Sequence, residues 1–191
     1  MKKVLSLFLA AVFMFLFIPE TINPMVFEAA ESSVSQLVDG VYYKIDGDHA
    51  VVTGCDAVAS VITVRAKYKD YPVTEIADSA FKNAVLEKVT LSDGVTKIGV
   101  SAFENCTKLA SIEIPETVTL LGNKVFGGCL AIKSIIVPAG VKTMGRYVFS
   151  GWTEDQIIYF ANLTEAPSGW HSEWFDSSDA TVVWNYQPET F

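Results

Sequence analysis

Few side chains in this sequence combine the chemistry and the spacing that catalysis or metal binding requires. The chain contains two histidines, His49 and His171, which lie far apart and form no zinc-binding pair. The sequence has no nucleophile elbow and no phosphate-binding loop. Carboxylates are plentiful, which leaves open a hydrolase with two paired carboxylates, but they are scattered along the chain, which argues against it. We expect no enzymatic activity, no cofactor and no bound metal.

One short segment contains several residues of types that coordinate metal ions. Asp46, Asp48 and His49 lie within four residues of one another around Gly47. No loop of calcium-binding spacing follows them. We therefore interpret them as solvated turn residues.

Two of the three cysteines have a regular spacing. Cys106 and Cys129 are 23 residues apart, and each follows a phenylalanine by three residues. If they lie in neighbouring structural units, their separation could suit a disulfide, which an exported protein could form. The alternative, which we favour, is a column of small buried thiols. Cys55 has no evident partner.

The cysteine spacing belongs to a repeat that covers the middle of the chain. Residues 95–115 are followed, 23 residues later, by a second copy at 118–138. Phenylalanines recur in the same register at spacings of 22, 23 and 23, namely Phe81, Phe103, Phe126 and Phe149. A fixed period of this length indicates stacked structural units, because a single unit cannot bury its own apolar face.

Each unit contains a strand pattern and a turn pattern. The segments near residues 86–91, 109–114 and 132–137 end in alternating apolar residues, which predicts short strands with one buried face. Stacked units place these strands parallel and about 4.8 Å apart, as the concave wall of a solenoid. The Val-x-x-Ile-Gly-x-x-Ala-Phe segments between them are expected to form convex turns. The glycine in each turn suits either a positive φ or a close backbone approach.

This pattern, V-x-x-I-G-x-x-A-F followed by C, L and I-x-I-P, resembles the BspA-type leucine-rich repeat. The resemblance covers residues 73 to about 152, and a degenerate form continues to the C-terminus. It implies a β-rich leucine-rich-repeat solenoid of the α/β horseshoe type, with tight or short helical turns on the convex face. It also implies secreted or surface-exposed proteins that adhere to host proteins or to other cells, without catalytic residues.

The sequence predicts four segments. Residues 1–30 have a charged start, an apolar run and small residues at Ala29 and Ala30, as a signal peptide does. Residues 31–72 form an N-terminal segment and cap, 73–152 the repeats of 22–23 residues, and 153–191 a degenerate repeat and C-terminal cap. The net charge of −8 is unchanged by removal of residues 1–30, which hold two lysines and two glutamates. This acidity argues against nucleic acid or an anionic membrane surface as a partner.

Both ends of the repeat array are expected to be capped. Residues 39–53 predict a β-hairpin around Asp46-Gly47, which, with a strand near 61–64, would cover the N-terminal end. Further strands near 156–160 and 180–184 would continue the sheet. All four tryptophans lie in the last forty residues, at Trp152, Trp170, Trp174 and Trp184. We expect them to form the plug of the C-terminal cap. The alternative is a sugar-stacking platform.

The solvent side of the strands is the expected binding surface. The outward position of each strand gives one column of residues, and the position two residues earlier gives a second. The first column is Thr90, Glu113, Ile136, Tyr159 and Val182, and the second is Lys88, Ser111, Ser134, Ile157 and Ala180. Both columns become apolar toward the C-terminus. We therefore expect a protein-binding patch containing Ile136, Ile157, Tyr159 and Val182, with Glu113 beside it. The alternatives are that the loop 170–175 covers this patch, or that β-branched residues are present only because they favour strands.

These observations favour an exported, non-enzymatic interaction module that binds extracellular or cell-surface proteins through the concave sheet, in the manner of an adhesin. One alternative is a carbohydrate-binding module that uses Trp170, Trp174 and Tyr159. Another is a surface component that assembles with its own kind. The expected location is secreted or extracellular, in association with a cell surface. No contact with a membrane is expected beyond the signal sequence.

Overall fold

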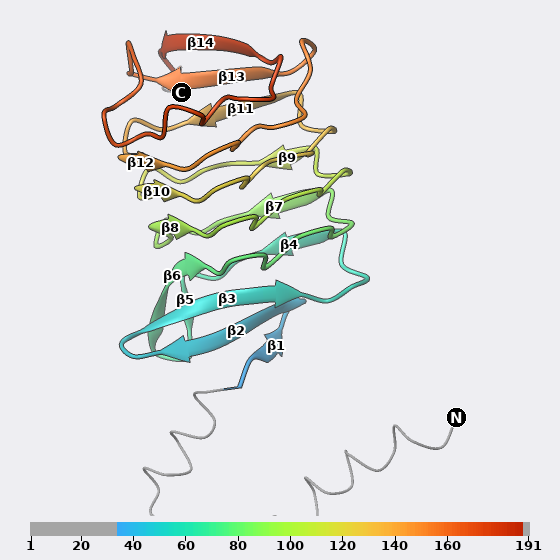
Figure 1. Cartoon of the computed structure of the whole chain (residues 1–191). Coiled ribbons are helices and arrows are strands. Elements are labelled where there is room, and N and C mark those ends of the chain that lie inside the picture. The colour runs from blue at the N-terminus through green and yellow to red at the C-terminus, as the bar shows by residue number, and fades with distance from the viewer. Residues whose placement is uncertain (1–33, 189–191) are drawn as a thin grey trace, which may run out of the picture. The chain divides into compact units, whose positions relative to one another are not determined.

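The computed structural model describes residues 34–188, which form a parallel β-solenoid (Figure 1). The expected signal peptide lies outside the described residues. Each coil contributes strands to two walls. The first wall contains β4 (Val61–Thr63), β7 (Lys88–Thr90), β9 (Ser111–Ile112), β11 (Ser134–Val137), β13 (Ile157–Ala161) and β14 (Thr181–Tyr186). The second wall contains β6 (Tyr71–Ile76), β8 (Lys97–Ile98), β10 (Leu120–Leu121) and β12 (Thr143–Met144). No helix occurs between residues 34 and 188.

The leucine-rich-repeat solenoid expected from the sequence is confirmed, with one part missed. The first wall consists of the predicted strands, and their pairings are parallel. The segments expected to be only turns also contain strands, because β6, β8, β10 and β12 pair in parallel to form the second wall. Each coil is therefore a flattened loop with two short strands, and the core lies between the walls.

The phenylalanine column forms the centre of the core. Phe81, Phe103, Phe126 and Phe149 are buried and stack on one another, with ring centroids 5.1, 5.7 and 6.0 Å apart. Each ring lies one coil above the previous ring, so the spacing of 22 or 23 residues in the sequence becomes the spacing of the coils. Stacked aromatic rings contribute about 0.5–1.5 kcal/mol per pair beyond the area that they bury.

Beside this column runs a ladder of side-chain hydrogen-bond donors. The Cys106 thiol donates to the Phe81 carbonyl over 2.9 Å, and the Cys129 thiol donates to the Phe103 carbonyl over 3.1 Å. In the next coil the indole of Trp152 takes the place of the thiol and donates to a carbonyl 2.8 Å away, that of Phe126. All three cysteines are free, so the structure contains the column of buried thiols and not the disulfide.

The glycine of each turn permits close approach between coils. Gly122 does not have a positive φ, but a Cβ added to it would lie 2.6 Å from the backbone nitrogen of Val100 in the preceding coil. The left-handed backbone occurs two residues further on, where Lys124 has a φ of 56°. Of the two reasons considered for this glycine, close approach is the one that the structure supports.

The N-terminal end is covered by a hairpin. Strands β1 (Gln36–Val38), β2 (Val41–Asp46) and β3 (His49–Cys55) are antiparallel, with Gly47 in the turn, and β3 pairs with β6. Strand β4 was expected in this cap, but it pairs with β7 and is the first strand of the first wall. A small hairpin of β5 (Lys67–Tyr68) with β6 completes this end.

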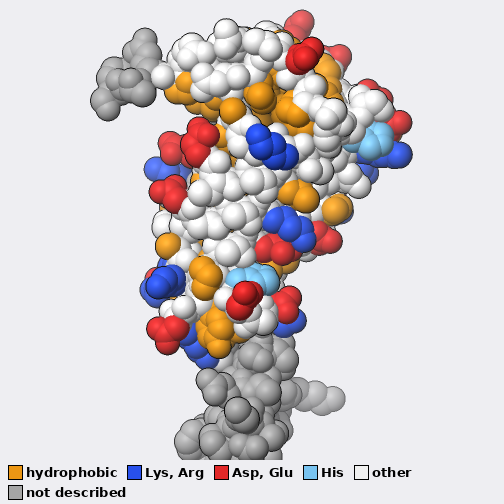
Figure 2. Space-filling view, turned by 90° about the vertical axis from the view of Figure 1, so that its left-hand side faces the viewer, with side chains coloured by type: hydrophobic (Ala, Val, Ile, Leu, Met, Phe, Trp, Pro, Cys, Tyr) orange, Lys and Arg blue, Asp and Glu red, His pale blue; other side chains and the backbone are white. Residues whose placement is uncertain are grey.

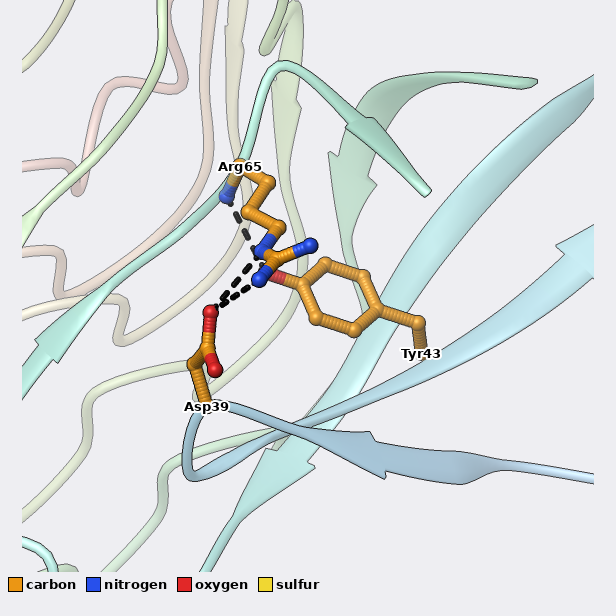
Figure 3. A network of polar contacts seen from close by, with 3 residues as sticks. All are labelled: Asp39, Tyr43 and Arg65. Atoms are coloured by element: carbon orange, nitrogen blue, oxygen red, sulfur yellow. Dashed lines mark hydrogen bonds and ion pairs between the residues drawn. The ribbon is translucent and has the colours of Figure 1, made fainter. Parts of the chain in front are cut away.

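A polar network ties the hairpin to the first coil (Figure 3). Arg65 pairs with Asp39 through its guanidinium, and its backbone N–H donates to the Tyr43 hydroxyl over 3.0 Å. The buried Tyr43 ring stacks on Tyr68, with centroids 5.1 Å apart. Burial raises the pKa of Tyr43, so the hydroxyl is neutral and accepts this hydrogen bond at neutral pH.

The C-terminal end is closed by aromatic rings. The Trp170 indole donates to the Val141 carbonyl, and its ring packs against Phe160, Trp174 and Trp184. The loop 170–175 continues the second wall, since Trp170 bridges to Met144. Gln156 is buried in the preceding coil, and its side-chain amide donates to the carbonyls of Cys129 and Ile132.

Candidate binding face

The outward side chains of the first wall form a surface of exposed and half-buried residues, which we call the β7–β13 face. It consists of Lys88, Thr90, Ser111, Glu113, Ser134, Ile136, Ile157 and Tyr159. Because side chains alternate along a strand, the residues between these positions, such as Ile112 and Ile135, point into the core. The expected change from polar to apolar side chains is present, since Lys88 and Glu113 are exposed near one end and Ile157 and Tyr159 are half-buried near the other.

The pairing of strands along this face is interrupted once. Strands β4, β7 and β9 form one sheet, and β11, β13 and β14 form another. Strands β9 and β11 therefore lie in neighbouring coils but do not pair with each other. On the opposite side of the same coils, β8, β10 and β12 pair without a break. The two sheets therefore separate only on the β7–β13 face.

Two cavities adjoin at this interruption. The larger, of about 450 Å³, is lined by Ala110, Ser111, Ile112, Glu113, Ile114, Glu116, Ser134, Ile135, Ile136 and Pro188. The smaller, of about 190 Å³, is lined by Lys88, Val89, Thr90, Ser111 and Glu113. Ser111 and Glu113 line both, so the cavities form one groove across β7, β9 and β11. Within residues 34–188, Glu113 and Glu116 form no ion pair.

The structure brings together four of the five residues expected in the binding patch. Glu113 and Ile136 face each other across the groove, and Ile157 and Tyr159 lie on the next strand. The placement of Val182 beside Tyr159 is wrong. Val182 pairs with the buried Ile158, and Val183 is the neighbour of Tyr159.

An extra residue in the last coil causes this error. The pairing of β13 with β14 joins residues 24 apart as far as Tyr159 and 25 apart at Ala161, beyond a register shift, whereas β11 and β13 join residues 23 apart. A shift of one residue moves a side chain to the other side of the sheet. Val182 consequently packs partly against the core. Thr181, and not Ala180, lies beside Ile157.

The aromatic residues near this face are only partly accessible. Trp170 is 7% exposed, and Trp174 packs edge-on against Phe160, so these rings belong to the end of the core. The loop that contains them does not cover the β7–β13 face, because it extends the second wall. Tyr159 is accompanied by Tyr186, with ring centroids 4.5 Å apart. Figure 2 shows another side of the molecule, where hydrophobic side chains gather near the C-terminal end.

The other residues considered for chemistry stay apart. His49 lies in the N-terminal hairpin and contacts Asp48, whereas His171 lies in the last coil and contacts Arg146. Across residues 34–188, no group of three or more histidine, cysteine, aspartate or glutamate side chains is arranged to hold a metal ion. The same part of the chain contains no helix long and apolar enough to span a membrane.

Comparison with solved structures gives similar folds. A leucine-rich-repeat protein of T. pallidum is 24% identical, with a TM-score of 0.61, over 78% of this chain and 64% of that one. A leucine-rich-repeat protein of Bacteroides ovatus is 28% identical, with a TM-score of 0.58, over 78% and 37%. A leucine-rich cell surface protein of Faecalibacterium prausnitzii is 20% identical, with a TM-score of 0.52, over 82% and 56%. The chain thus matches only part of the length of each.

Comparison at the sequence level identifies the repeat. No curated protein matches the chain. The profile of the BspA type leucine rich repeat region, in 6 copies, matches residues 74–174. These residues include the second wall from within β6 onward, the phenylalanine column and all of the β7–β13 face. With more than half of its residues matched, the chain belongs to the BspA-type leucine-rich-repeat family.

Proposed function

We propose that this protein is an exported, non-enzymatic interaction module that binds extracellular or cell-surface proteins in the manner of an adhesin. The observation that carries the proposal is the groove on the β7–β13 face, where two cavities adjoin among side chains exposed to solvent. The sequence of residues 1–30 and the surface location of the F. prausnitzii relative support export.

The groove has the mixed character of a protein-binding surface. Its lining combines the exposed aliphatic side chain of Ile136 with the carboxylates of Glu113 and Glu116, whereas Ile112 and Ile114, which also line the larger cavity, are almost fully buried. Apolar side chains that lose water on contact provide affinity, and charged side chains around them restrict the choice of partner. Ile136 is 40% exposed, which makes it the most direct apolar contact that the face offers.

Surface binding of the full chain to a panel of extracellular-matrix and serum proteins tests this proposal. We expect saturable binding to at least one panel member, with a loss of tenfold or more in the Ile136→Glu variant and a smaller loss in Tyr159→Ala. Leu130→Glu is the matched control, because Leu130 is 52% exposed and lies outside the β7–β13 face. Far-ultraviolet circular dichroism checks that each variant is folded. The absence of binding by folded wild-type protein would count against the proposal.

The glycan-binding alternative has one supporting observation. The paired rings of Tyr159 and Tyr186 are half-buried and lie at the apolar end of the face. Soluble glycans that perturb tyrosine or tryptophan fluorescence, with loss of this effect in Tyr159→Ala, would favour it. Concentration-dependent self-association without another ligand would instead favour a self-assembling surface component.

A further inference from the structure

We propose that the gap between β9 and β11 is a docking site for an extended, basic segment of a partner protein. This inference rests on the proposed function, since it specifies what the β7–β13 face binds. The gap would recognise the polypeptide backbone of the ligand first and a lysine or arginine side chain of the ligand second. Three features of the gap support it.

The first feature is the unused backbone at the gap. Elsewhere on this wall, neighbouring strands join through parallel ladders, but β9 and β11 do not pair. Their facing edges therefore carry N–H and C=O groups that strand pairing leaves unused. An extended peptide supplies both donors and acceptors at the spacing of a strand, so it can satisfy such groups. Sugars and small ions do not present this regular alternation.

The second feature is the size of the space. The larger cavity occupies about 450 Å³ on the gap and joins the smaller one through Ser111 and Glu113. Ligand cavities typically occupy about 300–1,000 Å³, so there is room for two or three side chains of a bound segment. The continuous pairing of β8, β10 and β12 holds the coils together on the second wall, behind the gap. A bound segment would therefore lie at the solvent side of the gap and would not pass between the coils.

The third feature is the charge of the lining. Glu113 and Glu116 are exposed, and neither has a partner of opposite charge within the described residues. The lysine of the groove, Lys88, lies at the opposite end, beside the smaller cavity. A basic side chain of the ligand would complement the two carboxylates, while Ile136 across the gap would contact an aliphatic side chain. The same carboxylates, and a net charge of −8, repel a nucleic acid.

A peptide titration tests the inference. The probe is a fluorescein-labelled Thr-Lys-Val-Lys-Val-Lys-Thr peptide, titrated with the full chain and followed by fluorescence anisotropy. We expect saturable binding, weakened about three- to fivefold by Glu113→Gln, as an exposed ion pair contributes, and about tenfold when Glu116→Gln is added. Glu154→Gln is the matched control, because Glu154 is an exposed carboxylate away from the groove. It should leave the affinity unchanged.

Two further peptides separate backbone recognition from charge. Replacing both valines by proline removes two N–H donors while the charge stays the same, and this change should weaken binding at least fivefold. Replacing the lysines by glutamates should abolish it. Equal binding of the proline peptide, or an equal effect of Glu154→Gln and Glu113→Gln, would show unspecific attraction to an acidic protein and would overturn the inference.

Binding to the panel of extracellular-matrix and serum proteins distinguishes this failure from a failure of the proposed function. If a panel protein binds the wild-type chain and binding is lost in Ile136→Glu but unchanged in the Glu113→Gln/Glu116→Gln variant, the face is an interaction surface and its basic-peptide specificity is wrong. If no panel protein binds and the lysine peptide does not bind, both proposals fail.

Discussion

At the scale of single residues, the buried thiols have the clearest chemical consequence. Cys106 is fully buried, and burial raises its pKa to about 11. Burial also raises the pKa of the Cys129 thiol, by a larger amount. Both thiols donate hydrogen bonds to carbonyls of the preceding coil, which requires the protonated form. They are therefore structural donors, and their reactivity as thiolates is suppressed.

This ionisation predicts a pH dependence of stability. In the unfolded chain a cysteine loses its proton near pH 8.5–9, whereas native Cys106 keeps it up to about pH 11. Between these values the native state binds more protons, so the free energy of unfolding falls as pH rises, by about 1.4 kcal/mol per pH unit for this thiol. Urea unfolding at pH 8, 9 and 10 measures the slope. Cys106→Ala should show a shallower slope, and equal slopes would contradict the assignment.

Side-chain identities predicted which residues are buried better than they predicted the end of the array. The regular recurrence of phenylalanine and cysteine was sufficient to place both columns in the core. Val182 was misplaced because the spacing of the earlier strands was extended across a coil that is one residue longer. Nothing in the apolar run from Val182 to Trp184 distinguishes the two registers, since all three side chains suit a half-buried strand.

At the scale of elements, the turns between the walls depend on two neighbouring positions with opposite requirements. Gly122 needs the absence of a Cβ, whereas Lys124 has a side chain at a backbone conformation that glycine adopts more easily. Substitutions at these positions should therefore act in opposite directions.

We expect Gly122→Ala to lower the free energy of unfolding by about 3 kcal/mol, because the new Cβ would lie 2.6 Å from backbone of the adjacent coil. Lys124→Gly should raise it by about 0.5–1 kcal/mol, because the left-handed φ of 56° is then unstrained. Chemical unfolding of the two variants beside the wild type measures both effects. A stabilising Gly122→Ala, or a Lys124→Gly as destabilising as Gly122→Ala, would contradict this description of the turn.

The strands of the first wall were predictable and those of the second were not. A strand such as β11 contains alternating apolar residues over four positions, which is enough for the period to show. The segments that contain β8, β10 and β12 instead place their buried apolar residues three apart, a spacing that does not alternate: Val95 and Ile98, Val118 and Leu121, and Val141 and Met144. The gap between β9 and β11 was equally invisible, because the segments 111–114 and 134–137 both fit the strand pattern.

At the scale of the molecule, stability depends on closing the open ends of the stack. The last coil covers the buried Phe149 and Phe160, because Trp174 packs edge-on against both rings and Trp170 packs against Phe160. In repeat proteins each unit is stabilised by its neighbours, so an uncovered unit exposes core surface to solvent.

Removal of residues 153–191 should therefore cause self-association. Size-exclusion chromatography with light scattering should show aggregates for the chain that ends at Trp152. A chain that ends at Tyr186 retains β14 and should elute as the full chain does. If the shorter chain remained monodisperse with a native-like circular dichroism spectrum, the last coil would not act as a cap.

The donor ladder also determines where this protein could gain or lose units. The segments 95–117 and 118–140 share the same turn, the same thiol donor and an aliphatic residue at the same position, Leu109 or Ile132. A duplicated copy between them would therefore contact matching surfaces on both sides. After them, the indole of Trp152 occupies the donor position, and the buried amide of Gln156 donates to the carbonyls of Cys129 and Ile132. A copy inserted beyond Trp152 would not contact a preceding coil that carries the thiol donor. Gene duplication could thus lengthen the protein only within its interior, and its C-terminal coil would be inherited unchanged.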